Sequence, residues 1–148
     1  MKVITSNRRA LKDHKVLQKF EAGVKLTGSE VKSLKQGRGK LDGSYIKMVG
    51  GNVVVVGMNI PKYSSSSQGA YDPIRTRNLL LNKNEIHKLN GLLSQKGFTA
   101  FPTKVYLKNN LIKLEIGVGT HLKKYQKKEK LKEKQEQRDL DRDLRGKV

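Results

Sequence analysis

Two apolar segments separated by a pair of glycines constrain the fold most strongly. Residues 44–49 (SYIKMV) alternate apolar and polar side chains, and residues 52–60 (NVVVVGMNI) form a β-branched run that is typical of a buried strand. Gly50 and Gly51 lie between them, and glycine adopts the positive φ angles of a two-residue turn at little cost. The sequence therefore predicts a β-hairpin here and, with it, an antiparallel sheet.

A second hairpin is predicted closer to the carboxyl end. Residues 103–108 (TKVYLK) and 111–116 (LIKLEI) alternate in the same way, and Asn109 and Asn110 supply the turn between them. Pro102 has no backbone N–H, so it predicts that its strand lies at an edge of the sheet or starts irregularly.

A weaker strand, two helices and a loop complete the pattern. Residues 16–26 (VLQKFEAGVKL) predict a strand in which Gly23 indicates a bulge or a close backbone approach. Residues 64–69 (SSSSQG) predict a flexible loop. Two helices are each expected to begin at a capping box and to end at a glycine. The first has its capping box at Thr27 and Glu30 and ends at Gly37, and the second has its capping box at Asn82 and Glu85 and ends at Gly97.

This pattern predicts a mainly β protein, an antiparallel β-barrel of the oligonucleotide-binding type with flanking short helices, over residues 1–119. Residues 120–148 form a basic tail with good helix formers but no packable apolar stripe. We expect this tail to be disordered when free and helical when bound to an anionic partner.

Positive charge is the main indication of the partner. The chain has 32 Lys and Arg against 13 Asp and Glu, for a net charge of +19, and residues 1–119 alone hold 21 basic and 7 acidic side chains. Such a surface predicts a polyanion, and nucleic acid is favoured over a membrane because bulky apolar anchors such as Trp are absent. The absence of Cys and of an apolar secretion signal predicts a soluble, cytoplasmic protein.

Several residues are candidates for RNA contact, each with a plain structural alternative. The cations that follow the first capping box, Lys32, Lys35, Arg38 and Lys40, could bind phosphates or form a solvated helix face. The extended arginines Arg75 and Arg77 could bind phosphates bidentately or lie in a solvated loop. Glu21 could accept hydrogen bonds from base amines or 2′-hydroxyls, or be a solvated strand residue.

Catalytic chemistry is not indicated. The three histidines, His14, His87 and His121, lack the spacing of paired metal ligands. Glu21 and Glu30 could in principle hold a metal ion for a nuclease, but Glu30 is better explained as a helix-capping residue. We therefore expect no enzyme activity, no metal and no cofactor.

The ordered blocks FEAGVKLTGSEVKSLKQGRGKL, DPIRTRNLLLN, GFTAFPTKVYLKNN and LEIGV, followed by a basic tail, resemble the small protein B family from about residue 7 to residue 145. The resemblance implies an oligonucleotide-binding-type barrel that binds the tRNA-like part of transfer-messenger RNA, also called SsrA RNA. It further implies a complex with elongation factor Tu, formed through the RNA, that enters stalled ribosomes. There the protein replaces the missing anticodon arm, and its tail settles in the decoding centre and the empty messenger channel, where we expect residues 120–148 to be helical.

The resemblance also implies which residues act. Glu21, Lys32, Leu80 and Asn82 match its RNA-contacting blocks, as do Arg75 and Arg77. In the tail, the matching ribosome-binding stretch contains Lys123, Lys124, Tyr125, Lys127 and Lys128. Departures from the family pattern fall at His121, Leu122, Gln126 and Lys128.

Two alternatives remain open beside a monomeric adaptor for transfer-messenger RNA. A ribosomal or initiation-type protein would share the basic barrel but bind ribosomal subunits without transfer-messenger RNA. A nuclease would need a divalent metal and turnover, and would depend on Glu21 for cleavage.

Overall fold

The computed structural model describes residues 1–63 and 70–145, and the loop predicted at residues 64–69 lies outside that range. Seven strands form one antiparallel sheet in the order β1-β6-β7-β2-β5-β4-β3. The strands are β1 (Lys2–Ser6), β2 (His14–Val24), β3 (Tyr45–Val49), β4 (Asn52–Val56), β5 (Arg77–Leu80), β6 (Phe98–Lys108) and β7 (Leu111–His121). The helices are α1 (Arg8–Asp13), α2 (Gly28–Lys35), α3 (Lys83–Leu93) and α4 (Lys124–Arg145).

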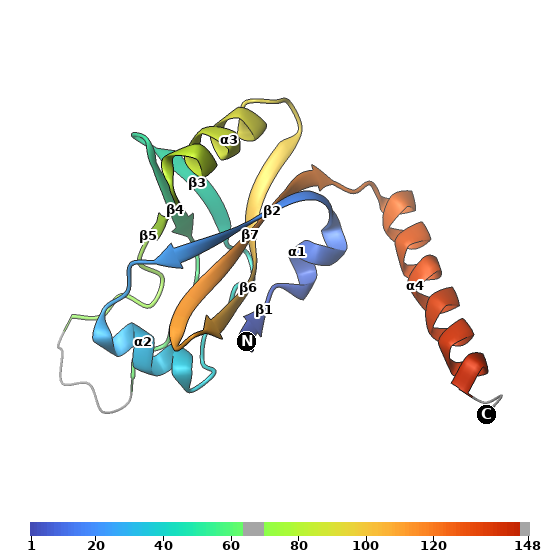
Figure 1. Cartoon of the computed structure of the whole chain (residues 1–148), viewed down its shortest axis with the longest axis horizontal. Coiled ribbons are helices and arrows are strands. Elements are labelled where there is room, and N and C mark those ends of the chain that lie inside the picture. The colour runs from blue at the N-terminus through green and yellow to red at the C-terminus, as the bar shows by residue number, and fades with distance from the viewer. Residues whose placement is uncertain (64–69, 146–148) are drawn as a thin grey trace.

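The sheet curls so that β3 approaches β6 (Figure 1). The two end strands, β1 and β3, are not paired with each other in the part of the chain that the structure describes, so the barrel is not closed. The predicted mainly β, antiparallel fold with short flanking helices is confirmed in all but this closure.

Both predicted hairpins are present. Gly50 and Gly51 have φ angles of 55° and 82° between β3 and β4, and Asn109 and Asn110 have φ angles of 51° and 64° between β6 and β7. Positive φ at both central residues suits the right-handed twist of the strands that a two-residue turn connects. β4 ends at Val56, earlier than predicted, because Gly57 has a φ angle of 81°, which a strand does not allow.

The strand that contains Pro102 is longer than predicted and lies inside the sheet from Lys104 onward, but at Pro102 it pairs on one side only and is irregular, as the second predicted alternative requires. β6 pairs with β7 along its length and with β1 from Lys104 to Leu107. Pro102 precedes the residues that pair with β1 and adjoins a register shift. The sheet therefore needs no hydrogen bond from the backbone nitrogen at this position, and a proline is tolerated there. Its carbonyl accepts a hydrogen bond from the side-chain nitrogen of buried Asn7.

The core lies inside the curled sheet and under two helices. Alternate residues of β2 and β7 point inward, and Leu34 of α2 and Leu89 of α3 are fully buried in the same hydrophobic core. Both predicted capping boxes are formed, and they fix where these helices begin. The predicted close approach at Gly23 is confirmed, because a Cβ there would lie 3.3 Å from the Cβ of Leu80.

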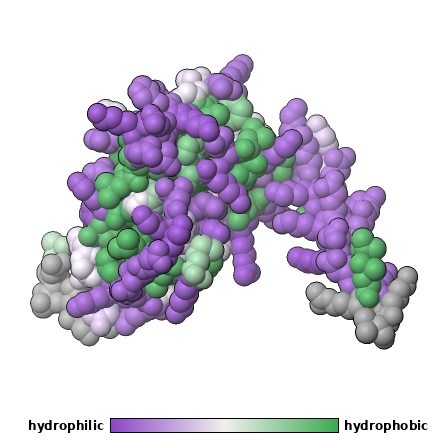
Figure 2. All heavy atoms as spheres, in the orientation of Figure 1, coloured by the Kyte–Doolittle hydropathy of each residue, from purple (hydrophilic) through white to green (hydrophobic). Residues whose placement is uncertain are grey.

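The carboxyl-terminal helix α4 projects away from the sheet (Figure 1), and its surface is mainly hydrophilic apart from an apolar patch near its carboxyl end (Figure 2). The predicted boundary at residue 119 falls inside β7, which continues to His121. Leu122 is also part of the body, since it is buried and its N–H donates to the carbonyl of Asp13. The predicted disorder of the free tail stays a prediction. No helix in the described ranges is both long and apolar enough to cross a membrane.

Candidate nucleic-acid interface

Glu21 lies on the outer face of β2, where two donors hold its carboxylate. The hydroxyl of Tyr106 donates to Oε1 at 2.8 Å, and Nζ of Lys108 donates to Oε2 at 3.2 Å. These hydrogen bonds hold the pKa of Glu21 below its usual value, so the carboxylate stays ionised at neutral pH. Its side chain is 37% exposed and can still accept hydrogen bonds from a partner.

Leu80 lies beside this carboxylate. Gly23 pairs with Leu80 in the sheet, and Gly23 and Glu21 share one face of β2 because they are two residues apart. Leu80 is 54% exposed, because it alternates along β5 with buried Leu79 and therefore lies on the outer face. The structure thus brings Glu21 and Leu80 together on one outer surface.

Asn82 follows two residues later as the N-cap of α3. Its side-chain oxygen accepts from the backbone N–H of Glu85 at 2.8 Å, and Glu85 accepts from the N–H of Asn82 at 3.2 Å. The cap occupies only the oxygen of the amide, and Asn82 is exposed, so its side-chain NH₂ can face a partner.

The cations Lys32, Lys35 and Arg38 lie on α2 and the turn after it, and all three are exposed. Figure 1 shows α2 and α3 at opposite ends of the strands, so these cations form a second group, apart from Asn82. Buried Leu34 anchors α2, and the side chain of Lys32 lies with Nζ 5.6 Å from the centre of the Tyr63 ring. Lys40 is also exposed, and its backbone pairs with Asn59.

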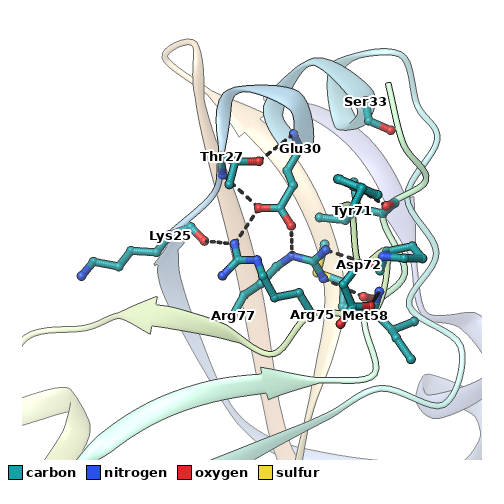
Figure 3. A network of polar contacts seen from close by, with 12 residues as sticks. Lys25, Thr27, Glu30, Ser33, Met58, Tyr71, Asp72, Arg75 and Arg77 are labelled. Carbon is teal, nitrogen blue, oxygen red and sulfur yellow. Dashed lines mark hydrogen bonds and ion pairs between the residues drawn. The ribbon is translucent and has the colours of Figure 1, made fainter. Parts of the chain in front are cut away.

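The prediction that Arg77 contacts a phosphate is wrong, because the structure buries this residue completely. Its Nε donates to Oε2 of Glu30 at 2.5 Å, and its other nitrogens donate to the carbonyls of Met58 and Pro73 (Figure 3). In a strand, alternate residues share a face, and Arg77 shares the inner face with Leu79. A guanidinium enclosed in this way cannot reach a phosphate, so its role is structural.

Glu30 joins this arginine to a second one. Its Oε1 accepts from Nη2 of Arg75 at 2.6 Å and from the N–H of Thr27 at 2.9 Å (Figure 3). Burial acts to raise the pKa of Glu30, but the bonds from Arg75, Thr27 and Arg77 outweigh it and hold the pKa below its usual value. Glu30 is therefore unavailable as a metal ligand with Glu21. Arg75 is 42% exposed, and its phosphate contact stays a prediction.

The predicted tail residues lie in the first turns of α4 and just before it. Lys123, Lys124, Tyr125 and Lys128 are exposed, with Tyr125 60% exposed. Lys127 lies closer to the body, with Nζ 3.1 Å from Oδ1 of Asp13. Gln126 accepts from the N–H of Lys123 at 2.9 Å, so this departure from the family pattern caps the helix.

A family model described as "SmpB protein" matches residues 4–146 of this chain. The chain belongs to the SmpB family. A relative from Thermosipho melanesiensis named "SsrA-binding protein" is 42% identical over 130 residues, which cover 87% of this chain and 88% of the relative. Another of that name, from Persephonella marina, is 40% identical over 148 residues, covering 100% and 97%.

A solved structure supports the same assignment. One chain of the structure described as "tmRNA-SmpB: a journey to the center of the bacterial ribosome" superposes with a TM-score of 0.68 and is 35% identical. The match covers 84% of this chain and 92% of the other. Membership of the SmpB family, inferred above from short sequence blocks, is thus confirmed.

Two features of this SmpB-family chain were missed at the level of sequence. The first is the pair of donors on Glu21, because Tyr106 and Lys108 lie 85 and 87 residues away. The second is the meeting of His14 with His121, whose rings lie 5.0 Å apart where β2 pairs with β7. No group of three or more His, Cys, Asp or Glu in the described ranges could hold a metal ion.

Proposed function

We propose that this SmpB-family chain binds transfer-messenger RNA and acts with it on the bacterial ribosome in trans-translation, as an adaptor and not as an enzyme. The observation that carries the proposal is the similarity over nearly the whole chain to SsrA-binding proteins and to SmpB in the tmRNA-SmpB structure. A cytoplasmic, monomeric protein without a cofactor is part of the same proposal, as is an indirect association with elongation factor Tu through the RNA.

The body is proposed to recognise the tRNA-like part of that RNA. Lys32, Lys35, Arg38 and Arg75 would bind phosphates, which fixes the position of the RNA without reading its sequence. Glu21, with Leu80 beside it, would supply the contacts that discriminate. A carboxylate repels phosphates, so it is useful only where it accepts hydrogen bonds from base amines or from 2′-hydroxyls.

The tail is proposed to act on the ribosome. Lys123, Lys124, Lys127 and Lys128 would bind ribosomal RNA phosphates in the decoding centre and messenger channel, and the exposed ring of Tyr125 can stack on a base. We further propose that the tail residues which form α4 in the structure, Lys124–Arg145, are disordered before this binding. The exposed i,i+3 pair of Asp139 and Arg142 supports the helix by only about 0.2–0.5 kcal/mol.

The RNA that accompanies the protein in cells tests this proposal. Protein carrying an amino-terminal tag, purified from bacterial cells, is expected to bring down SsrA RNA as its most enriched RNA, which sequencing would measure. In cells that lack SsrA RNA, its association with stalled ribosomes should fall to background. Retention of ribosome association in those cells, with no enrichment of SsrA RNA in normal cells, would favour the ribosomal or initiation-type alternative.

A further inference from the structure

The carboxylate of Glu21 is held from across the sheet. Tyr106 is on β6 and Glu21 is on β2, and β7 runs between these two strands. Tyr106 pairs with Lys113 of β7, and Lys113 pairs in turn with Gly23 of β2. The hydroxyl of Tyr106 therefore spans the outer face of β7 to reach Oε1 of Glu21 at 2.8 Å.

The two donors on Glu21 differ in rigidity. The side chain of Tyr106 is 5% exposed and has two rotatable bonds before its ring, so its hydroxyl occupies a fixed position. The side chain of Lys108 is 51% exposed and has a long flexible stem, and its charge is screened by salt. Tyr106 can therefore orient the carboxylate, whereas Lys108 mainly offsets its charge.

We propose that Tyr106 is a positioning residue for RNA recognition, which holds the Glu21 carboxylate in the orientation that accepts donors from the RNA. This inference rests on the proposed function. Each carboxylate oxygen can accept more than one hydrogen bond, so Oε1 and Oε2 keep accepting capacity toward solvent after the donors of Tyr106 and Lys108 are counted. A free glutamate would lose rotamer freedom on binding, and prior ordering removes that loss.

The protonation states suit this arrangement. The hydrogen bond from Tyr106 is the largest cause that lowers the pKa of Glu21, with Lys108 second. Burial raises the pKa of the Tyr106 hydroxyl, and its bond to Glu21 raises it further. At neutral pH, Tyr106 is therefore the donor and Glu21 the ionised acceptor.

A double-mutant cycle tests the inference with the full-length protein and the tRNA-like part of SsrA RNA. Tyr106→Phe removes only the hydroxyl and is expected to weaken binding about five- to tenfold, the fold-change that corresponds to the net contribution of one typical hydrogen bond. In a Glu21→Gln background, the same substitution is expected to change binding by less than about twofold, because the oriented charge is already gone. A merely structural role would weaken binding equally in both backgrounds.

Two further measurements separate the possible failures. Tyr71→Phe is the matched control, because the Tyr71 hydroxyl also donates to a buried partner, the carbonyl of Ile60, but not to Glu21. It is expected to leave binding unchanged. In the free protein, NMR titration of the Glu21 carboxyl is expected to show a higher pKa in Tyr106→Phe and an unchanged pKa in Tyr71→Phe.

The inference is overturned if wild-type protein prefers the tRNA-like RNA and Glu21→Gln weakens that binding, but Tyr106→Phe binds like wild type or costs the same in both backgrounds. An unchanged Glu21 pKa in Tyr106→Phe would overturn it as well, without any RNA. Failure of the proposed function would look different, because wild-type protein would then show no preference for the tRNA-like RNA at all.

Discussion

Replacing Arg77 by methionine is expected to lower the free energy of unfolding by about 3–5 kcal/mol, the usual cost of leaving a buried charge without its partner. Glu30 is 1% exposed, so its carboxylate cannot turn to water when the guanidinium is removed. The carbonyls of Met58 and Pro73 would lose their donors at the same time. Urea unfolding followed by circular dichroism measures the loss.

Arg75→Met is the matched control, because it removes the other guanidinium on Glu30. Arg75 is 42% exposed and partly screened by solvent, so the expected loss is about 1 kcal/mol or less. Adding Glu30→Gln to Arg77→Met should recover part of the loss, since the amide carries no charge and can still cap Thr27. Equal losses for Arg75→Met and Arg77→Met would contradict the structural role assigned to Arg77.

The stability of the same network should depend on pH in a defined direction. The folded state lowers the pKa of Glu30 from its ordinary value of 4.5. Its contribution is therefore fully present above that value and is lost as the pH falls from there through the folded-state pKa. As the pH falls over this range, the free energy of unfolding should decrease less for Arg77→Met than for wild type. Without Arg77, the folded state stabilises the charged form of the Glu30 carboxylate less.

A chain truncated after Lys123 is expected to lose tagging on stalled ribosomes almost completely while keeping its affinity for SsrA RNA within about 1 kcal/mol, or about fivefold. This end point leaves β7 and buried Leu122 intact, whereas a cut at residue 119 would remove paired residues of the sheet. Translation of a message without a stop codon, with SsrA RNA supplied, measures tagging, and filter binding measures affinity.

A full-length control separates loss of the tail from loss of its proposed contacts. Changing Lys124, Tyr125 and Lys128 to alanine keeps the tail able to form its helix, because alanine is the best helix former. This variant should bind SsrA RNA like wild type and tag poorly. Normal tagging by the truncated chain would show that the division of labour between body and tail is wrong.

The parts of the fold that depend on neighbouring residues could be predicted from the sequence. The two capping boxes, at Thr27 and at Asn82, and the glycine and asparagine turns all have local causes, and the structure contains each of them. The start of the chain was not predicted to form regular structure. β1 is short, and α1 has no buried residue, so neither has a strong periodic pattern.

The contacts of the candidate site join residues that are far apart in the sequence and could not be predicted from it. The sequence predicts a phosphate contact for Arg77 because an extended arginine can bind phosphates bidentately, but its buried partner, Glu30, lies 47 residues away and is not visible in the local pattern. Glu21 is exposed, as an RNA contact requires, and that contact stays a prediction, whereas the donors that hold its carboxylate come from another strand. Charge and composition identify the class of partner, whereas the orientation of single side chains depends on contacts between distant segments.

The most direct test of the central claim is a competition between two RNAs for the purified full-length protein. At one fixed salt concentration, since phosphate contacts make affinity strongly salt-dependent, the tRNA-like part of SsrA RNA competes with an unrelated structured RNA of equal length. The account predicts a preference of about a hundredfold or more for the tRNA-like RNA, because recognition goes beyond charge. Equal affinity for the two RNAs would contradict it.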